Sequence, residues 1–129
     1  MRKGSCLCGA VVFTVEGDMK PPIACHCREC RQQSGHYFAA SETRRDAVKF
    51  TNDEGLAWYK ASDFASRGFC RHCGSKLFWS RDGSPMIHVL MASLEAPTAL
   101  KLSVHMWAGE KGDYYDIADG LPQVEGDDI

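Results

Sequence analysis

Seven cysteines are the residues of this 129-residue chain whose type and spacing suggest chemistry. Because the number is odd, they cannot all pair as internal disulfides, and a chain of this length can fold around its apolar core without such cross-links. Reduced cysteines at short spacing are typical of metal ligands or redox groups. They form three groups: Cys6-Leu7-Cys8, Cys25-His26-Cys27-Arg28-Glu29-Cys30 and Cys70-Arg71-His72-Cys73.

The first two groups contain cysteines two positions apart. In an extended segment, residues i and i+2 point to the same face. We therefore expect Cys6 and Cys8 to reach one metal ion, with Leu7 turned away. The same spacing within 25–27 predicts that His26 points away from a metal held by its two neighbours.

Two other cysteine pairs are separated by two residues, Cys27-x-x-Cys30 and Cys70-x-x-Cys73. This spacing resembles a metal-binding knuckle, a tight turn in which the thiolates converge and backbone N–H groups can face the sulfur atoms. Gly74 suits the left-handed conformation that closes such a turn.

Zinc is the expected ion, since thiolate-rich tetrahedral sites favour Zn²⁺ or an iron–sulfur cluster. Four thiolates close a structural site, whereas three leave a position for water or substrate. Two partitions stay open, because Cys27/Cys30 and Cys70/Cys73 could form a zinc-ribbon site. The contiguous triplet Cys25, Cys27 and Cys30 favours the other partition, which keeps these three together. The closed site then consists of the remaining cysteines, Cys6, Cys8, Cys70 and Cys73.

Composition and charge argue against several classes of protein. The chain carries 15 Lys and Arg against 17 Asp and Glu, a formal net charge of -2, and no basic cluster denser than Arg44-Arg45. A nucleic-acid-binding face normally concentrates basic residues, so we expect no nucleic-acid partner. The longest apolar stretch, 86–92, contains His88 and falls far short of the ~20 residues of a membrane helix, so we expect no membrane partner either.

The first residues bear on location. Met1-Arg2-Lys3 is positively charged, as in a signal peptide, but 4–9 contains glycine, serine and cysteine in place of an apolar segment. We therefore expect a cytoplasmic protein, in which thiols stay reduced.

Most of the apolar periodicity is two, which indicates strands. We expect a single domain over 1–129 that is mainly β, with short antiparallel strands in layered sheets and one short helical segment. The helix is predicted at 28–34, ending at Gly35, and 124–129 is predicted to be a loose acidic end. The strands are predicted at 11–15, 23–27, 36–40, 48–50, 56–59, 77–79, 86–91 and 100–106.

Three motifs that contain the cysteines, 4–11, 25–35 and 67–78, resemble the glutathione-dependent formaldehyde-activating enzyme family, which includes a centromere protein V branch. They occur in the family's order, and Asp119-Gly-Leu-Pro-Gln123 is also similar. A conservative departure lies at 92–95, Ala-Ser-Leu-Glu, where the family often has a Gly-Thr-Leu-Asp-like turn.

The resemblance implies a zinc-stabilised "β-tent" fold with two Zn²⁺ per chain. It implies a catalytic zinc at Cys25, Cys27 and Cys30. It also implies a carbon–sulfur lyase whose partners are a small thiol such as glutathione and a small aldehyde such as formaldehyde. The structural zinc is implied at the other four cysteines, Cys6, Cys8, Cys70 and Cys73.

The open zinc position suggests thiol activation as the mechanism. A substrate thiol that displaces zinc-bound water would be held as the reactive thiolate and could add to an aldehyde carbon. Arg28, Arg31 and Lys76 either pair with carboxylates of a glutathione-like substrate or simply face solvent. His36, beside the flexible Gly35, is the best histidine candidate for a fourth ligand, although a surface or core histidine is the commoner case.

Two other functions compete with the lyase. A redox dithiol at Cys70 and Cys73 would normally open a helix after a strand, whereas 77–79 continues as a predicted strand. A non-enzymatic interaction module with two structural zinc ions is the main alternative, and two inert zinc ions would identify it.

Overall fold

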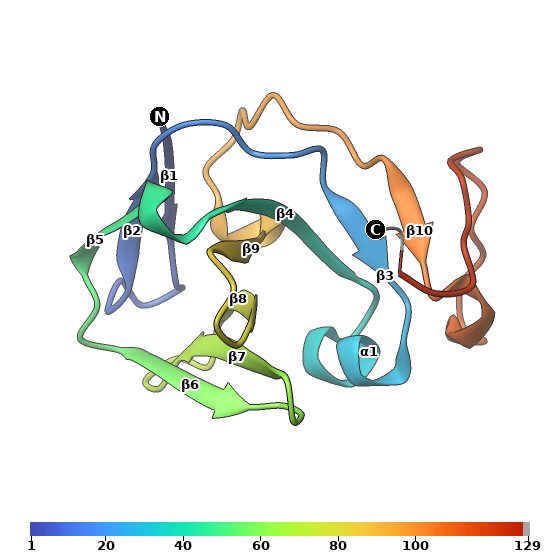
Figure 1. The fold of residues 1–129 in the computed structure, drawn as a ribbon, viewed down its shortest axis with the longest axis horizontal. Coiled ribbons are helices and arrows are strands. Elements are labelled where there is room, and N and C mark those ends of the chain that lie inside the picture. The colour runs from blue at the N-terminus through green and yellow to red at the C-terminus, as the bar shows by residue number, and fades with distance from the viewer. Residues whose placement is uncertain (128–129) are drawn as a thin grey trace. The chain divides into compact units, whose positions relative to one another are not determined.

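The structure is a computed structural model that describes residues 1–127, and the chain divides into two compact units. The first unit comprises 1–20 and 41–99, and the second comprises 21–40 and the chain from Leu100 on. The fold is mainly β, with strands drawn as arrows in Figure 1 and one α-helix among the described residues.

The first unit contains a three-stranded antiparallel sheet in the order β1-β2-β5. Its strands are β1 (Arg2–Ser5), β2 (Val12–Val15) and β5 (Val48–Asn52). Phe13 and Val15 alternate with half-buried neighbours and are fully buried, as a strand with one covered face requires. Gly4 lies against the Phe13 ring, where an added Cβ would come within 2.4 Å of a ring carbon.

Four other strands of the first unit pair antiparallel in the order β6-β7-β8-β9 and form part of a seven-stranded sheet. These strands are β6 (Leu56–Lys60), β7 (Ala65–Cys70), β8 (Lys76–Arg81) and β9 (Met86–Leu90). The two sheets are layered, because the rings of Phe13 and Phe78 pack with centroids 5.0 Å apart. Leu77, Phe78 and Val89 complete a core from which water is excluded.

The second unit is built on β3 (Ile23–Cys25), which pairs antiparallel with the first three residues of β4 (Phe38–Arg44) and parallel with β10 (Val104–Met106). The rest of β4 belongs to the first unit. Helix α1 (Arg28–Ser34) connects β3 to β4. It begins after Cys27 as N-cap and ends at Gly35, whose φ of 81° is left-handed. Short 3₁₀ turns lie in the first unit at η1 (Arg45–Ala47) and η2 (Met91–Ser93), and in the second unit at η3 (Ala108–Glu110).

The mainly β class, the layered sheets and the helix at 28–34 are confirmed. Strand β7 was not predicted, because Gly68 interrupts the apolar alternation. This glycine lies under two aromatic rings, where an added Cβ would be 3.0 Å from Phe78 and 3.1 Å from Trp58. The parallel pair β3–β10 is an exception to the predicted antiparallel strands. A single domain over 1–129 stays a prediction.

The prediction of a loose acidic end was wrong for 124–127. The Val124 N–H donates to the carbonyl of His105, and the Val124 carbonyl accepts from the N–H of Ala108. The indole N–H of Trp107 donates to the Asp127 carboxylate over 2.6 Å. The acidic composition of this segment gave no indication of these contacts. Asp128 and Ile129 lie outside the described residues. No helix within 1–127 has the length and apolar character needed to cross a membrane.

Candidate metal centres

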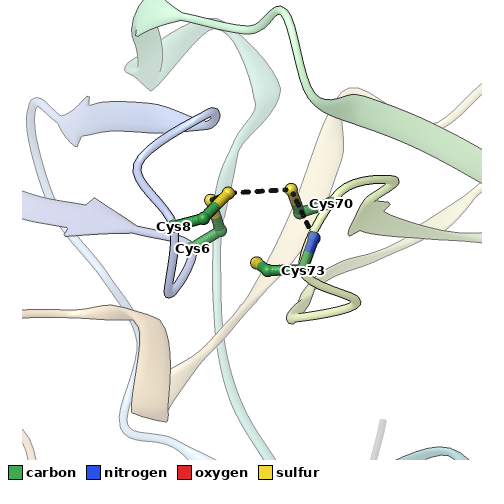
Figure 2. A group of neighbouring side chains, drawn as sticks. All are labelled: Cys6, Cys8, Cys70 and Cys73. Atoms are coloured by element: carbon green, nitrogen blue, oxygen red, sulfur yellow. Dashed lines mark hydrogen bonds between the residues drawn. The ribbon is translucent and has the colours of Figure 1, made fainter.

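Four cysteines of the first unit converge from two loops (Figure 2). Cys6 follows β1 and Cys8 lies in the next turn, whereas Cys70 ends β7 and Cys73 lies in the turn toward β8. All four Sγ atoms lie within 4.8 Å of one another. We refer to Cys6, Cys8, Cys70 and Cys73 as the four-cysteine cluster.

Backbone N–H groups face the sulfur atoms of this cluster. The N–H of Val11 donates to Cys6 Sγ over 3.2 Å. Cys70 Sγ accepts from the N–H groups of His72 and Cys73 over 3.4 and 3.5 Å, as expected for a knuckle. Gly74 has the left-handed φ of 78° that the sequence predicted.

The segment around Cys8 is a turn and is not extended as predicted. Gly9 adopts a φ of 86°, which bends the chain directly after this cysteine. Leu7 is still turned away, with 89% of its surface exposed. The first loop is therefore a second tight turn that presents its two cysteines to the knuckle.

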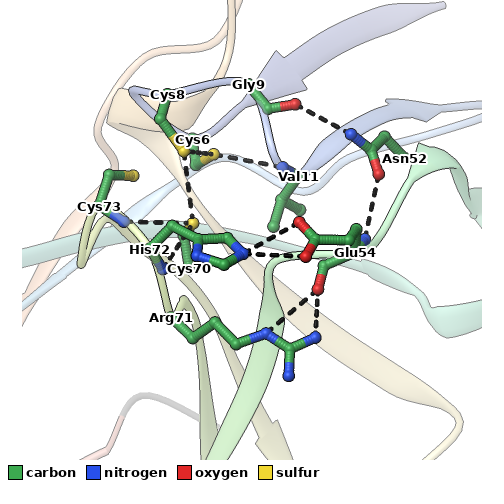
Figure 3. A network of polar contacts seen from close by, with 10 residues as sticks. All are labelled: Cys6, Cys8, Gly9, Val11, Asn52, Glu54, Cys70, Arg71, His72 and Cys73. Atoms are coloured by element: carbon green, nitrogen blue, oxygen red, sulfur yellow. Dashed lines mark hydrogen bonds and ion pairs between the residues drawn. The ribbon is translucent and has the colours of Figure 1, made fainter.

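A polar network supports the knuckle from outside (Figure 3). The His72 ring contacts the Glu54 carboxylate at 3.0 Å, and the Arg71 guanidinium donates to the backbone carbonyl of Glu54. Asn52 accepts from the Glu54 N–H and donates to the carbonyl of Gly9. The β5–β6 turn thus connects both cysteine loops. The sequence analysis did not identify Asn52 or Glu54, because they lie in a turn more than 15 residues before the knuckle and belong to no motif.

Electrostatics in the cluster favour a cation. The hydroxyl and N–H of Ser75 lower the pKa of Cys73 to about 5. The N–H of Ala10 lowers the pKa of Cys8, but loss of water around the thiol and the neighbouring thiols outweigh this effect and raise that pKa to about 11. Adjacent thiols resist joint ionisation, and a bound cation removes that repulsion.

Three cysteines of the second unit form the other group, which we call the triplet. Cys25 ends β3, Cys27 caps α1, and Cys30 lies in the first turn of the helix. Their Sγ atoms lie within 4.8 Å of one another, and the Cys30 N–H donates to Cys27 Sγ over 3.4 Å. Hydrogen bonds to the other two thiols, with burial, raise the pKa of Cys25 well above its usual range.

Both groups suit zinc by their donor chemistry. Four converging thiolates complete a tetrahedral site, whereas three leave one position for a further ligand. Cys25 and Cys30 are buried and Cys27 is half-buried, so Cys27 is the most exposed of the three. The sulfur atoms fall into the same two groups as the favoured partition, and zinc binding by each group stays a prediction.

His26 points away from the triplet sulfurs into a buried chain of hydrogen bonds. Its Nε2 lies 2.8 Å from His105 Nδ1, and its Nδ1 lies 2.6 Å from the Tyr115 hydroxyl. His105 Nε2 in turn lies 2.8 Å from Asp119 Oδ2. Burial and, next, the charge of His105 lower the pKa of His26 to about 4. Sequence reasoning missed this chain, and the only signal for it was the motif that begins at Asp119.

The other predicted substrate and ligand residues lie in different settings. His36 is exposed and its ring packs edge-on against Tyr115 at 4.4 Å between centroids. Arg31 Nε donates to the carbonyls of His26 and Glu110 over 3.1 and 3.0 Å, a structural use of this side chain. Arg28 is exposed. In the first unit, exposed Lys76 lies over the Phe69 ring.

Comparison with known proteins identifies a family and proteins that are similar to this chain. The family model described as glutathione-dependent formaldehyde-activating enzyme matches residues 1–110. An uncharacterized lyase from Schizosaccharomyces pombe is 26% identical over 129 residues, covering 98% of this chain and 93% of the relative. The crystal structure of a Rhodobacter sphaeroides protein is 28% identical with a TM-score of 0.59, covering 78% of this chain and 99% of that one.

Proposed function

Because the chain belongs to the glutathione-dependent formaldehyde-activating enzyme family, we propose that it is a zinc-dependent carbon–sulfur lyase acting on the adduct of a small thiol and an aldehyde. Family membership and the lyase relative support an enzyme of the lyase class. Glutathione is the thiol and formaldehyde the aldehyde in this proposal. A β-tent fold and a cytoplasmic location are further expectations of it.

The triplet is the proposed catalytic site. Cys25, Cys27 and Cys30 would hold one Zn²⁺, and the observation that supports this is the convergence of three thiols where no fourth cysteine is grouped with them in the described chain. When bound there, zinc would supply the chemistry that keeps a substrate thiol in its reactive thiolate form at neutral pH. The four-cysteine cluster would hold a second, structural Zn²⁺, giving two ions per chain.

The chain's own groups then have distinct tasks. The N–H of Cys30, which faces Cys27 Sγ, stabilises negative charge on that sulfur. Arg28 is exposed next to Cys27 in sequence and would bind a substrate carboxylate, whereas the Arg31 Nε donates to two backbone carbonyls. In the reaction, a sulfur electron pair forms the C–S bond, the carbonyl π electrons move to oxygen, and that oxygen takes a proton. The reverse reaction breaks the same bond.

The test combines metal content with exchange kinetics. Zinc per chain is measured by mass spectrometry, and interconversion of glutathione plus formaldehyde with S-hydroxymethylglutathione is measured by NMR exchange spectroscopy. In Cys27→Ser we expect loss of one of two zinc ions and a rate more than about 100-fold lower, since changing mere supports of ligands already costs roughly 10–100-fold. Gln32→Ala, an exposed change on the same helix, is the matched control.

Two outcomes oppose the proposal. If Cys27→Ser keeps both zinc ions and the full exchange rate, the triplet is not the catalytic site. If the wild-type protein holds two zinc ions that resist chelators and does not accelerate exchange, the chain is a non-enzymatic zinc module.

A further inference from the structure

A four-residue hydrogen-bond chain lies beside the triplet and has no role in the function proposed above. It runs Tyr115–His26–His105–Asp119, with heavy-atom separations of 2.6, 2.8 and 2.8 Å. His26 is 0% exposed and His105 is 2% exposed, whereas the Asp119 side chain is 43% exposed. The chain thus runs from a surface carboxylate through two buried rings to a phenol.

Both ring nitrogens of each histidine are occupied, which restricts where the protons lie. Only one proton fits between His26 Nε2 and His105 Nδ1, so one ring must donate and the other accept. An ionised carboxylate only accepts, so His105 Nε2 carries the proton directed at Asp119. With both rings neutral, His105 Nδ1 then accepts from His26 Nε2–H, and His26 Nδ1 accepts from the Tyr115 hydroxyl.

The carboxylate at the end of the chain is held in place by a second contact. Asp119 Oδ1 accepts from the Leu121 N–H over 3.0 Å while its Oδ2 faces His105. Both contacts lower the pKa of Asp119, that of Leu121 first. Two donors therefore converge on two oxygens, and the carboxylate has no donor of its own to offer.

The backbone next to the triplet is also held by hydrogen bonds. His26 lies between Cys25 and Cys27, and its N–H donates to the carbonyl of Met106 over 3.0 Å. Met106 is the register partner of Cys25 in the parallel pair β3–β10. The His26 backbone is therefore held by Met106 and its ring by Tyr115 and His105, within the segment that presents two of the three thiols.

We propose that Asp119 is a positioning residue that sets the direction of the Tyr115–His26–His105–Asp119 chain, and through it orients the Cys25–Cys27 segment and the Tyr115 hydroxyl. The direction is a property of these four side chains alone. Only the expected effect on metal retention rests on the proposed function of the triplet.

One substitution should reverse the chain. The amide of Asp119→Asn has a single oxygen, which the fixed Leu121 N–H claims, so its NH₂ faces His105. His105 Nε2 must then accept, its Nδ1–H donates to His26, and His26 Nδ1–H donates to the Tyr115 oxygen. A role in shape alone would leave the proton positions unchanged, because Asn is nearly isosteric with Asp.

The experiment is ¹⁵N NMR of the histidine rings in the zinc-loaded full chain, since ring nitrogens with and without a proton differ strongly in chemical shift. In the wild type we expect protons on Nε2 of both His26 and His105, and in Asp119→Asn on Nδ1 of both. Asp116→Asn, an exposed neighbouring change, should match the wild type. A wild-type protein with a proton on Nδ1 of His105, or an Asp119→Asn variant with unchanged protons, would overturn the proposal.

Metal retention tests the orienting role separately. Zinc release to a chelator should be faster in Asp119→Asn by about tenfold for one ion, within the range for groups that support metal ligands. Reversed protons with unchanged release would refute the orienting role while leaving the triplet's function intact. If Cys27→Ser also leaves zinc content unchanged, the proposed function fails and the direction of the chain still stands on the wild-type spectrum.

Discussion

The two cysteine groups solve different problems with the same ligand. The four-cysteine cluster joins residues far apart in sequence, since the contacting Cys8 and Cys70 are 62 positions apart, and its turns are closed by Gly9 and Gly74. The triplet is local, spanning the end of β3 and the first turn of α1. Closing a long loop restricts the unfolded chain, whereas a local site restricts it little. We therefore expect the four-cysteine cluster to control folding and the triplet to control the chemistry.

The largest effect is expected from removing a sulfur from the four-cysteine cluster. Cys70 is fully buried and accepts two backbone N–H groups, so Cys70→Ser should lower the free energy of unfolding by more than about 4 kcal/mol, as for loss of a structural metal. Urea unfolding followed by circular dichroism measures this change. Cys27→Ser should cost much less, and equal losses in the two variants would refute the division of roles.

Chelation should separate the two groups in time. The triplet offers three thiols, whereas the four-cysteine cluster offers four, so we expect the zinc of the triplet to leave at least about tenfold faster. Zinc release is followed with a colorimetric chelator, and circular dichroism of the same sample reports folding. The first ion should leave with the fold intact, and a single release phase that coincides with unfolding would contradict the comparison.

A smaller loss of stability is expected at Gly55, whose backbone packs closely against the four-cysteine cluster. At Gly55 an added Cβ would lie 2.7 Å from Ala10 Cβ and 3.0 Å from Cys70 Sγ. Gly55→Ala should therefore cost about 1–3 kcal/mol by overpacking and speed release of the cluster's zinc alone. Thermal unfolding and the release assay measure both effects. Gly126→Ala has nothing within 4 Å of the added Cβ and serves as the control. Faster loss from the triplet in Gly55→Ala would count against the assignment.

The smallest effect is expected at the network outside the knuckle. Glu54→Gln keeps the backbone contact with Arg71 and loses the carboxylate facing His72, whose side chain is 49% exposed. Exposed ion pairs contribute about 0–1 kcal/mol, so the stability change should be small. Urea unfolding of this variant beside the exposed control Glu95→Gln gives the difference. A loss as large as that of Gly55→Ala would show that the network, and not packing, positions the cluster.

Local signals predicted more of the molecule than distant ones. The helix at 28–34 was predicted from its polar residues and from Gly35, whose left-handed conformation ends it. The structure adds the side chain of Cys27 as the N-cap. The knuckle at Cys70 and Cys73 was likewise predicted from residues that are close together in the sequence. The turn at Gly9 was missed because i, i+2 spacing fits a strand and a tight turn equally.

Features that depend on long-range register could not be predicted. The contact between His26 and His105 joins residues 79 positions apart, and it exists because β3 and β10 pair in parallel, which no local pattern specifies. Strand β7 escaped detection because Gly68 is placed for the rings of Trp58 and Phe78, which other strands supply. The candidate thiols were therefore visible in the sequence, and the groups that hold them in place were not.

The parallel pairing of β3 with β10 also sets an order of events during synthesis. Helix α1 and the triplet are made before β10, and His105 is made 79 residues after His26. At about 5–20 residues per second, that interval lasts roughly 4–16 s. During it the triplet's thiols lack their buried neighbours and are open to oxidation or to capture of a wrong metal. Stable loading of this site should therefore follow the translation of β10 and of the residues that pair with it.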